Sequence, residues 1–203
     1  MARLLVYYAH PGHRFSRVNK EMAHLAKSRE NLTFVDLYGE YPRYDIQVEV
    51  EKERLISHDV ILFQHPLFWY STPSLVKEWI DLVLEHGFAF GAGGDKLAGK
   101  IMMNVISAAG PEEAFTPKGY QHYPLRTFLT PLEQTARLCH MHYAAPYVLY
   151  SALTAKEDGE LSAHVKGYGD LLTAIVEDRF DFEASYSADI IAAPKIHDFI
   201  RRA

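Results

Sequence analysis

The sequence predicts a doubly wound α/β domain, in which a five-stranded parallel sheet has helices on both faces. Five short apolar runs alternate along the chain with five segments whose apolar residues recur at helical spacing. The first and third runs have the pattern expected of parallel strands that are buried on both faces. The chain has 203 residues, a length that fits one domain with a substantial core.

The first elements follow from residues 3–57. Residues 3–9 form an unbroken apolar run and are predicted to be the first strand. A helix should follow, with Ser16 as its N-cap and Asn19 in its first turn. Its apolar positions fall at i, i+4, i+7 and i+8 and are Val18, Met22, Leu25 and Ala26. Residues 32–36 are predicted to be the second strand, and the charged residues 49–57 a solvated helix.

The middle of the chain repeats this alternation. Residues 59–64 are predicted to be the third strand. The strongly apolar helix over residues 75–84 should begin with Thr72 as N-cap and Pro73 at the first helical position. Residues 100–107 are the predicted fourth strand. A long loop with several prolines then extends from residue 108 to about residue 127.

The last third supplies two helices and one strand. Leu132, Ala136 and Cys139 indicate a helix that confines Pro131 to its first turn. Residues 143–150 are the predicted fifth strand, and residues 161–176 show the spacing of a helix. The domain is expected to span residues 1–182, which leaves residues 183–203 as a C-terminal extension without a firm assignment.

Composition and charge exclude several classes of protein. The net charge of −5 provides no basic field of the kind that nucleic-acid binding needs. One cysteine, Cys139, allows no disulfide within the chain and fits a reducing compartment. No apolar run approaches the roughly 18 residues of a membrane span, and the first strand is too short for a signal peptide. We therefore expect a cytoplasmic protein.

Three suggestive patterns are set aside. Residues 94–101 nearly match a phosphate loop, but Ile101 offers no hydroxyl to magnesium and the segment leads into a strand. The histidine pairs 10/13 and 140/142 lack Cys, Asp or Glu at ligand spacing, so no metal site is expected. Cys139 lies on the apolar face of its helix and is interpreted as a buried, unreactive thiol.

Ligands of doubly wound sheets bind at the carboxyl ends of the strands, so loops 10–16, 65–72 and 107–127 are the candidate binding loops. The first joins a strand to a helix, and its N–H groups with the positive end of the helix suit a phosphate. Ser16 and Asn19 would add neutral donors, and Arg14 and Arg17 positive charge. A capped helix after an ordinary polar turn explains the same residues equally well.

The second loop contains four consecutive large apolar residues, Leu67 to Tyr70, between Pro66 and Pro73. A loop at the carboxyl end of a strand is usually exposed, so this composition is unusual for a surface segment. A rigid aromatic loop that lays its backbone along a planar ring system would explain it. The alternative is an aromatic plug that packs on the following helix.

Several stretches together resemble a known family. They are Tyr8-Ala9-His10-Pro11 with Ser16-Arg17-Val18-Asn19, Gln64 to Pro73, Leu75 to Asp81, Gly87 to Gly91, and Leu97 to Lys100. Through them, residues 3–178 resemble the flavodoxin-like NAD(P)H:quinone oxidoreductases, and most closely the ancillary subunits of glutathione-regulated potassium-efflux systems. The most specific part is the pattern H-P-x-x-W-Y-S-x-P over residues 65–73.

The resemblance implies a flavin, which is FMN in the small bacterial members and FAD in larger relatives. By position, the phosphate and ribityl chain would be held by His10, Ser16, Arg17, Val18 and Asn19. The isoalloxazine would be lined by Leu67, Phe68, Trp69 and Tyr70. The family usually has Thr-Thr-Gly-Gly after the fourth strand, where this chain has Ser107, Ala108, Ala109 and Gly110. Backbone amides can still face the flavin there, but one hydroxyl and one glycine are lost.

The resemblance also implies a Tyr and a His in the loop after the fourth strand. Phe115 stands at the position of that Tyr, and the His is displaced to His122. We predict His122 as the proton donor to the reduced substrate, with Tyr120 or Tyr123 as the substitute. A surface histidine without chemistry is the alternative interpretation.

Three functions follow from the resemblance. The first is two-electron reduction of quinones or related electrophiles by NAD(P)H, with ping-pong hydride transfer through the flavin. The second is a regulatory ancillary subunit of a potassium-efflux antiporter, held at the inner face of the membrane by that partner. The third is a flavodoxin-type electron carrier. The resemblance further implies a homodimer that packs through the stretch from Trp79 to Phe90.

Overall fold

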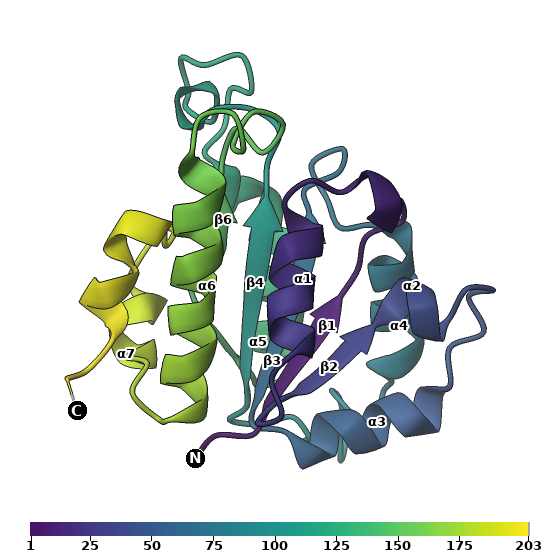
Figure 1. Ribbon diagram of the computed structural model, residues 1–203. Helices are drawn as coiled ribbons and strands as arrows, with labels where there is room; N and C mark the ends of the chain where they lie inside the picture. Colours follow the sequence, from purple (N-terminus) through teal and green to yellow (C-terminus); the bar gives the residue numbers. More distant parts are fainter. Residues whose placement is uncertain (203) are drawn as a thin grey trace.

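One parallel sheet forms the centre of the computed structural model, which describes residues 1–202 (Figure 1). Its strands are β1 (Leu4–Tyr8), β2 (Thr33–Asp36), β3 (Val60–Pro66), β4 (Ile101–Ser107), β5 (His142–Tyr143) and β6 (Tyr147–Leu149). They are ordered β2-β1-β3-β4-β5, and β6 also pairs with β4. Every one of these pairings is parallel. The predicted doubly wound sheet is therefore confirmed.

Helices cover both faces of the sheet (Figure 1). One face packs on α1 (Asn19–Lys27) and α6 (Glu160–Val176), and the other on α3 (Val48–Ser57), α4 (Ser74–Val83) and α5 (Thr130–Leu138). Side chains of β1 alternate between the two cores, with Leu4 and Val6 in one and Leu5 and Tyr7 in the other. The shorter helical elements are η1 (His13–Phe15), α2 (Leu37–Glu40), η2 (Glu112–Ala114), η3 (Leu125–Leu129), α7 (Phe182–Tyr186) and η4 (Ala193–Phe199).

Two predicted helix starts are displaced. α1 begins at Asn19 rather than directly after Ser16, yet the Ser16 hydroxyl still accepts the Lys20 N–H at 3.1 Å. α4 begins at Ser74, because Pro73 remains extended, and no side chain caps this helix. The predicted N-cap role of Thr72 is therefore wrong.

The predicted fifth strand is interrupted. Residues 144–146 separate β5 from β6, and Pro146 has no N–H to donate to a neighbouring strand. Both pieces still pair with β4, so the fifth position of the sheet is filled by two short strands.

The prediction that residues 49–57 form a solvated helix is only partly correct. α3 is a helix, but Glu51 is completely buried on it and Leu55 is buried as well. The Glu51 carboxylate accepts hydrogen bonds from the Tyr7 and Tyr41 hydroxyls, from Trp79 Nε1 at 3.0 Å and from Arg54. Burial and the proximity of this carboxylate raise the pKa of Tyr7 well above its usual value. Glu51 thus joins β1, α2 and α4 in one polar cluster.

A second buried titratable group lies on α6. His164 is buried, and neither ring nitrogen finds a hydrogen-bond partner within residues 1–202. Its ring stacks on Tyr147 with 4.4 Å between centroids, and the Tyr147 hydroxyl donates to the His164 carbonyl at 2.8 Å. Burial lowers the pKa of His164 to about 3, so the ring is neutral in the folded protein. Cys139 is buried as predicted, and burial raises its pKa to about 11.

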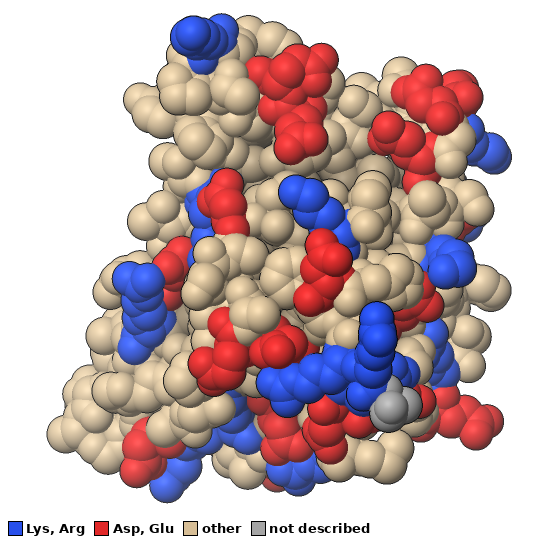
Figure 2. Space-filling model, turned by 90° about the vertical axis from the view of Figure 1, so that its left-hand side faces the viewer, with Lys and Arg blue, Asp and Glu red and all other residues tan. Residues whose placement is uncertain are grey.

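The C-terminal segment, which contains α7 and η4, packs along α6 and the outer edge of the sheet (Figure 1). Ile191 pairs with β6, since Val148 N–H donates to the Ile191 carbonyl at 2.9 Å and Ile191 N–H to Pro146 at 2.8 Å. Figure 2 shows basic and acidic side chains interspersed over this side of the molecule. Within the C-terminal segment, Arg201 forms an ion pair with Asp181 at 3.0 Å.

Candidate functional site

A cavity of about 350 Å³ lies at the carboxyl edge of the sheet, near the ends of the adjacent strands β1 and β3. The order of the strands reverses here, because β2 lies beyond β1 on one side and β4 lies beyond β3 on the other. Such a switch point is where doubly wound sheets bind ligands. The volume lies within the usual range of small-molecule sites. The lining residues are His10, Gly12, Phe15, Ser16, Arg17, Val18, Asn19, Pro66, Leu67, Phe68, Ser107, Ala109, Ala152 and Leu153.

The start of α1 presents free backbone donors to this cavity. The N–H groups of Arg17, Val18 and Asn19 donate to no other group within residues 1–202, as is usual before the first turn of a helix. These amides and the positive end of the nine-residue helix favour an anion. The neighbouring Ser16 hydroxyl already accepts from Lys20 and retains its own proton to donate.

Asn19 is the residue of the cavity whose polar atoms are least satisfied. Its side chain is buried, and Nδ2 donates to Ser107 Oγ at 2.6 Å. Its main-chain carbonyl accepts from Gln64 Nε2 at 2.9 Å, which fixes α1 against β3. Asn19 Oδ1 has no partner among the described residues. A buried polar atom without a partner indicates a missing ligand or water, and this one lies on the cavity wall.

The loop after β4 supplies two more free donors. Ala108 is buried and its amide is used, because it donates to the Leu149 carbonyl at 2.8 Å. The next two N–H groups, of Ala109 and Gly110, donate to no residue in the described chain. Ala109 lines the cavity, whereas Ala108 and Gly110 do not.

The aromatic loop is a two-residue hairpin. Phe68 and Ser71 exchange both backbone hydrogen bonds at 3.0 Å, and the residues between them, Trp69 and Tyr70, have φ of 47° and 65°. Positive φ at both positions defines a type I′ turn, which favours Asn-Gly and is strained with aromatic residues. Trp69 is 92% exposed. Leu67 and Phe68 line the cavity, and the predicted partners Trp69 and Tyr70 stand outside it.

Two residues of the first loop that could attract an anion, Arg17 and His10, have partners already. Arg17 donates to the Leu153 carbonyl at 3.0 Å and pairs with Glu157 at 3.3 Å, so its guanidinium is turned toward the loop after β6. His10 Nδ1 accepts from Gly12 N–H at 3.2 Å, and burial lowers the pKa of His10. The free backbone N–H groups at the start of α1 are therefore the main donors that the cavity offers to an anion.

The predicted catalytic residues lie in the loop after β4 but do not line the cavity. His122 is exposed with φ of 64°, and its N–H donates to the Gly119 carbonyl at 3.0 Å. Tyr120 is exposed beside Gly110, where a Cβ would come within 2.9 Å of the Tyr120 hydroxyl. Tyr123 is exposed and Phe115 is buried. The proton-donor role of His122 stays a prediction.

Sequence reasoning missed part of the cavity wall. Ala152 and Leu153 follow β6, the second of the two short strands in the fifth position, and contribute to the lining. The rule that ligands bind at the carboxyl ends of strands applied to this loop as well. Within residues 1–202, no three His, Cys, Asp or Glu side chains come together as a metal site would require. No helix among them is long and apolar enough to cross a bilayer.

A family model described as flavodoxin-like fold matches residues 2–172. The chain belongs to this family. The potassium-efflux ancillary protein KefG of Serratia proteamaculans is 44% identical over 170 residues, covering 84% of this chain and 92% of the relative. Quinone reductases are among the structural neighbours of this flavodoxin-like chain, which confirms the predicted family.

Two solved structures of flavodoxin-like proteins extend the comparison. General stress protein 14 of Treponema denticola, solved in complex with FMN, is 28% identical with a TM-score of 0.79, covering 85% of this chain and 99% of that one. An NADPH-quinone reductase from P. pentosaceus is 25% identical with a TM-score of 0.73, covering 83% and 96% of the two chains. Relatives of this flavodoxin-like protein thus include an FMN-binding protein and a quinone reductase.

Proposed function

We propose that this protein is an FMN-dependent NAD(P)H oxidoreductase that reduces quinones or related electrophiles by two electrons. The observation that supports it most is the cavity at the switch point, with free amides at α1, free amides after β4 and the unpartnered Asn19 Oδ1. The FMN-bound relative and the quinone-reductase relative support the same assignment.

The residues of the cavity fit the parts of FMN. The amides of Arg17, Val18 and Asn19 with the Ser16 hydroxyl would hold the phosphate, and Asn19 Oδ1 would accept from a ribityl hydroxyl. Leu67 and Phe68 would cover the ring system, and the free N–H group of Ala109 would favour negative charge on it. FMN, when bound, supplies the capacity to accept a hydride from NAD(P)H and to reduce a quinone.

Flavin titration tests the proposal directly. We expect the purified protein to bind about one FMN per chain, measured by absorbance and by extraction of the cofactor. Ser16→Ala should weaken binding by about 1–2 kcal/mol through loss of a hydrogen bond to a charged group. Ser28→Ala, at the other end of α1, is the matched control and should bind as the wild type does. A protein that gains no flavin absorbance with added FMN contradicts the proposal.

The proposed proton donor can be tested separately. His122→Asn tolerates the positive φ of this position and removes the titratable ring. With NADPH and a benzoquinone, we expect turnover to fall roughly tenfold or more at unchanged FMN content, as removal of an acid catalyst predicts. Tyr120→Phe is the companion variant. Wild-type turnover in His122→Asn would assign the proton to another donor.

We further propose a homodimer that packs through the segments around the cavity mouth. Much of the stretch from Trp79 to Phe90 is used by the protein's own core, since Trp79, Val83, Phe88 and Ala89 are buried. Five exposed large apolar residues lie in or directly beside the segments that line the cavity: Phe15, Phe68, Trp69, Tyr70 and Leu153. Light scattering at micromolar concentration should give twice the 23.2 kDa of one chain, and Trp69→Ser should shift it toward the monomer. A wild-type mass of one chain contradicts this expectation.

A second candidate function is that of an ancillary subunit of a potassium-efflux antiporter, which would hold the protein at the inner face of the membrane. The similarity to KefG supports it. Potassium efflux from cells that contain such an antiporter and lack its own ancillary protein should rise when this chain is expressed. Efflux that does not respond to the chain would argue against this role.

A further inference from the structure

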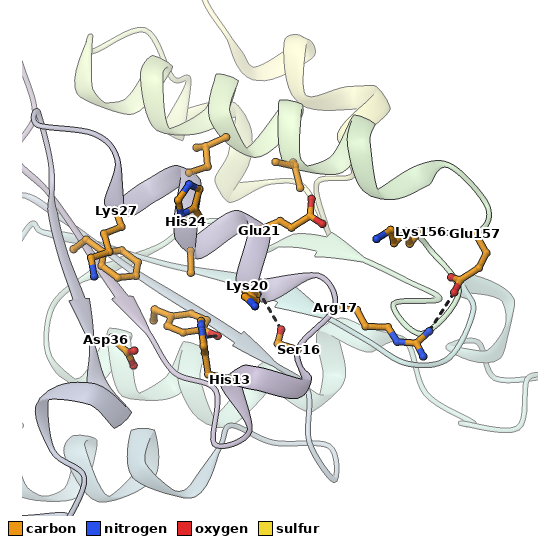
Figure 3. Close-up of a pocket in the computed structure, with 15 residues that line it drawn as sticks. His13, Ser16, Arg17, Lys20, Glu21, His24, Lys27, Asp36, Lys156 and Glu157 are labelled. Carbon is orange, nitrogen blue, oxygen red and sulfur yellow. Dashed lines mark hydrogen bonds and ion pairs between the residues drawn. The ribbon is translucent and has the colours of Figure 1, made fainter.

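A second and larger cleft, of about 1030 Å³, lies along the outer side of α1. It shares Ser16 and Arg17 with the smaller cavity but opens on the other side of these residues, toward the end of β2 and toward α6. Figure 3 shows His13 and Asp36 on the β2 side of α1, and Glu21, Lys156 and Glu157 on the side of α6. The proposed flavin site leaves this cleft without a role.

Positive charge lines α1 where it borders the cleft. Lys20, His24 and Lys27 are exposed and stand at i, i+4 and i+7, a spacing that places them in one row along the helix. Arg17 is paired with Glu157 at 3.3 Å, whereas Lys20 and Lys27 pair with no carboxylate among residues 1–202. Lys20 and Lys27 lie two helical turns apart in this row, and their unpaired ammonium groups provide charge that attracts a phosphate.

The wall of the cleft formed by β2 combines the aromatic side chain of Phe34 with the carboxylate of Asp36. The partly exposed Phe34 stacks on the buried Tyr8 with 6.1 Å between ring centroids, and the Tyr8 hydroxyl is hydrogen-bonded to His13 Nδ1 at 2.7 Å. Asp36 is the last residue of β2, and its Oδ1 accepts the Gly39 N–H at 3.2 Å. Its other carboxylate oxygen is free to accept further hydrogen bonds. In the dinucleotide-binding members of the doubly wound folds, a carboxylate at the end of the second strand binds ribose hydroxyls, and Asp36 occupies the corresponding place in this sheet.

We propose that this cleft binds a nucleoside 5′-phosphate. The base lies against Phe34, the ribose hydroxyls donate to Asp36, and the phosphate is held by Lys20 and Lys27. A 2′-phosphate would meet the Asp36 carboxylate, so the cleft discriminates against 2′-phosphorylated ribose. The assignment is independent of whether the smaller cavity binds FMN.

Calorimetric titration with AMP, carried out with excess FMN present, tests the assignment. Lys20→Glu with Lys27→Glu should weaken AMP binding about tenfold or more, because two contacts to the charged phosphate are lost. Both residues are exposed, so the fold tolerates the change. Lys77→Glu on α4, on the opposite face of the sheet, is the control and should leave AMP binding unchanged. A wild-type protein that binds no AMP at millimolar concentration, or a double variant that binds as the wild type, overturns the proposal.

The ribose contact has a test of its own. Wild-type protein should prefer AMP over adenosine 2′,5′-bisphosphate by about fivefold or more, and Asp36→Asn should abolish the preference while it keeps an acceptor for Gly39. Equal preferences in wild type and variant would overturn the role of Asp36. Displacement of AMP by NADH would identify a dinucleotide as the source of the nucleoside phosphate, and retention of AMP a free mononucleotide. AMP binding that disappears when FMN is added places AMP in the smaller cavity and overturns the assignment.

Discussion

Replacing Glu51 by alanine is expected to lower the free energy of unfolding by about 3–5 kcal/mol, the usual effect of breaking a buried ionic cluster. Glu51 is completely buried and is the common acceptor of four donors. Its loss leaves the Tyr7 hydroxyl and Trp79 Nε1 without a partner in the core, and both residues are buried. Urea unfolding followed by circular dichroism measures the change.

Glu49→Ala is the matched control on the same helix. The Glu49 side chain is 82% exposed and pairs with Lys52 at 2.8 Å. Surface ion pairs contribute at most about 1 kcal/mol, so this variant should unfold close to the wild-type midpoint. Similar losses in the two variants would show that the cluster around Glu51 contributes no more than a surface pair.

Acidification is expected to destabilise the protein through His164. Burial lowers the pKa of His164 to about 3 in the folded state, whereas an unfolded histidine has a pKa of about 6.5. Between these two pKa values, His164 is protonated in the unfolded chain and neutral in the folded protein. The stabilising effect is complete above pH 6.5 and is lost as the pH falls toward 3, by up to ~1.4 kcal/mol per unit. Between pH 6.5 and 5, His164 should account for about 2 kcal/mol.

The matched variant is His164→Phe, which keeps a ring to stack on Tyr147 and cannot take up a proton. Other buried histidines also contribute to the pH dependence, because burial lowers the pKa of His65 as well. The measured quantity is therefore the difference in slope between wild type and variant. His24→Gln, exposed on α1, should keep the wild-type slope. Parallel slopes for wild type and His164→Phe would show that the ring is not kept neutral by the fold.

The sheet was predictable from sequence because its strands are buried on both faces and carry runs of apolar residues, such as Leu4–Tyr8 of β1 and residues 60–63 of β3. Local signals failed where tertiary contacts decide the outcome. Glu51 looks solvated among its charged neighbours, and only Tyr7, Tyr41 and Trp79, distant in sequence, make its burial possible. The short α2 was missed because four residues are too few for a periodic signal.

The candidate site was also predictable only in part. The loops at the carboxyl ends of β1, β3 and β4 were predictable from topology and meet in one cavity. Orientation within those loops was not predictable. The type I′ turn points Trp69 outward although the sequence places it beside Leu67 and Phe68, and the partners of Arg17 lie far along the chain.

The pairing of Ile191 with β6 has a consequence for solubility. An uncovered strand edge offers N–H and C=O groups to strands of other molecules and so promotes aggregation. Here the segment around Ile191 satisfies Val148 N–H and the Pro146 carbonyl at the outer edge of the sheet. A version of the protein shortened to the residues of the family match would expose this edge together with the apolar side of α6. The segment around Ile191 therefore prevents strands of other molecules from adding to this edge, whatever the two clefts bind.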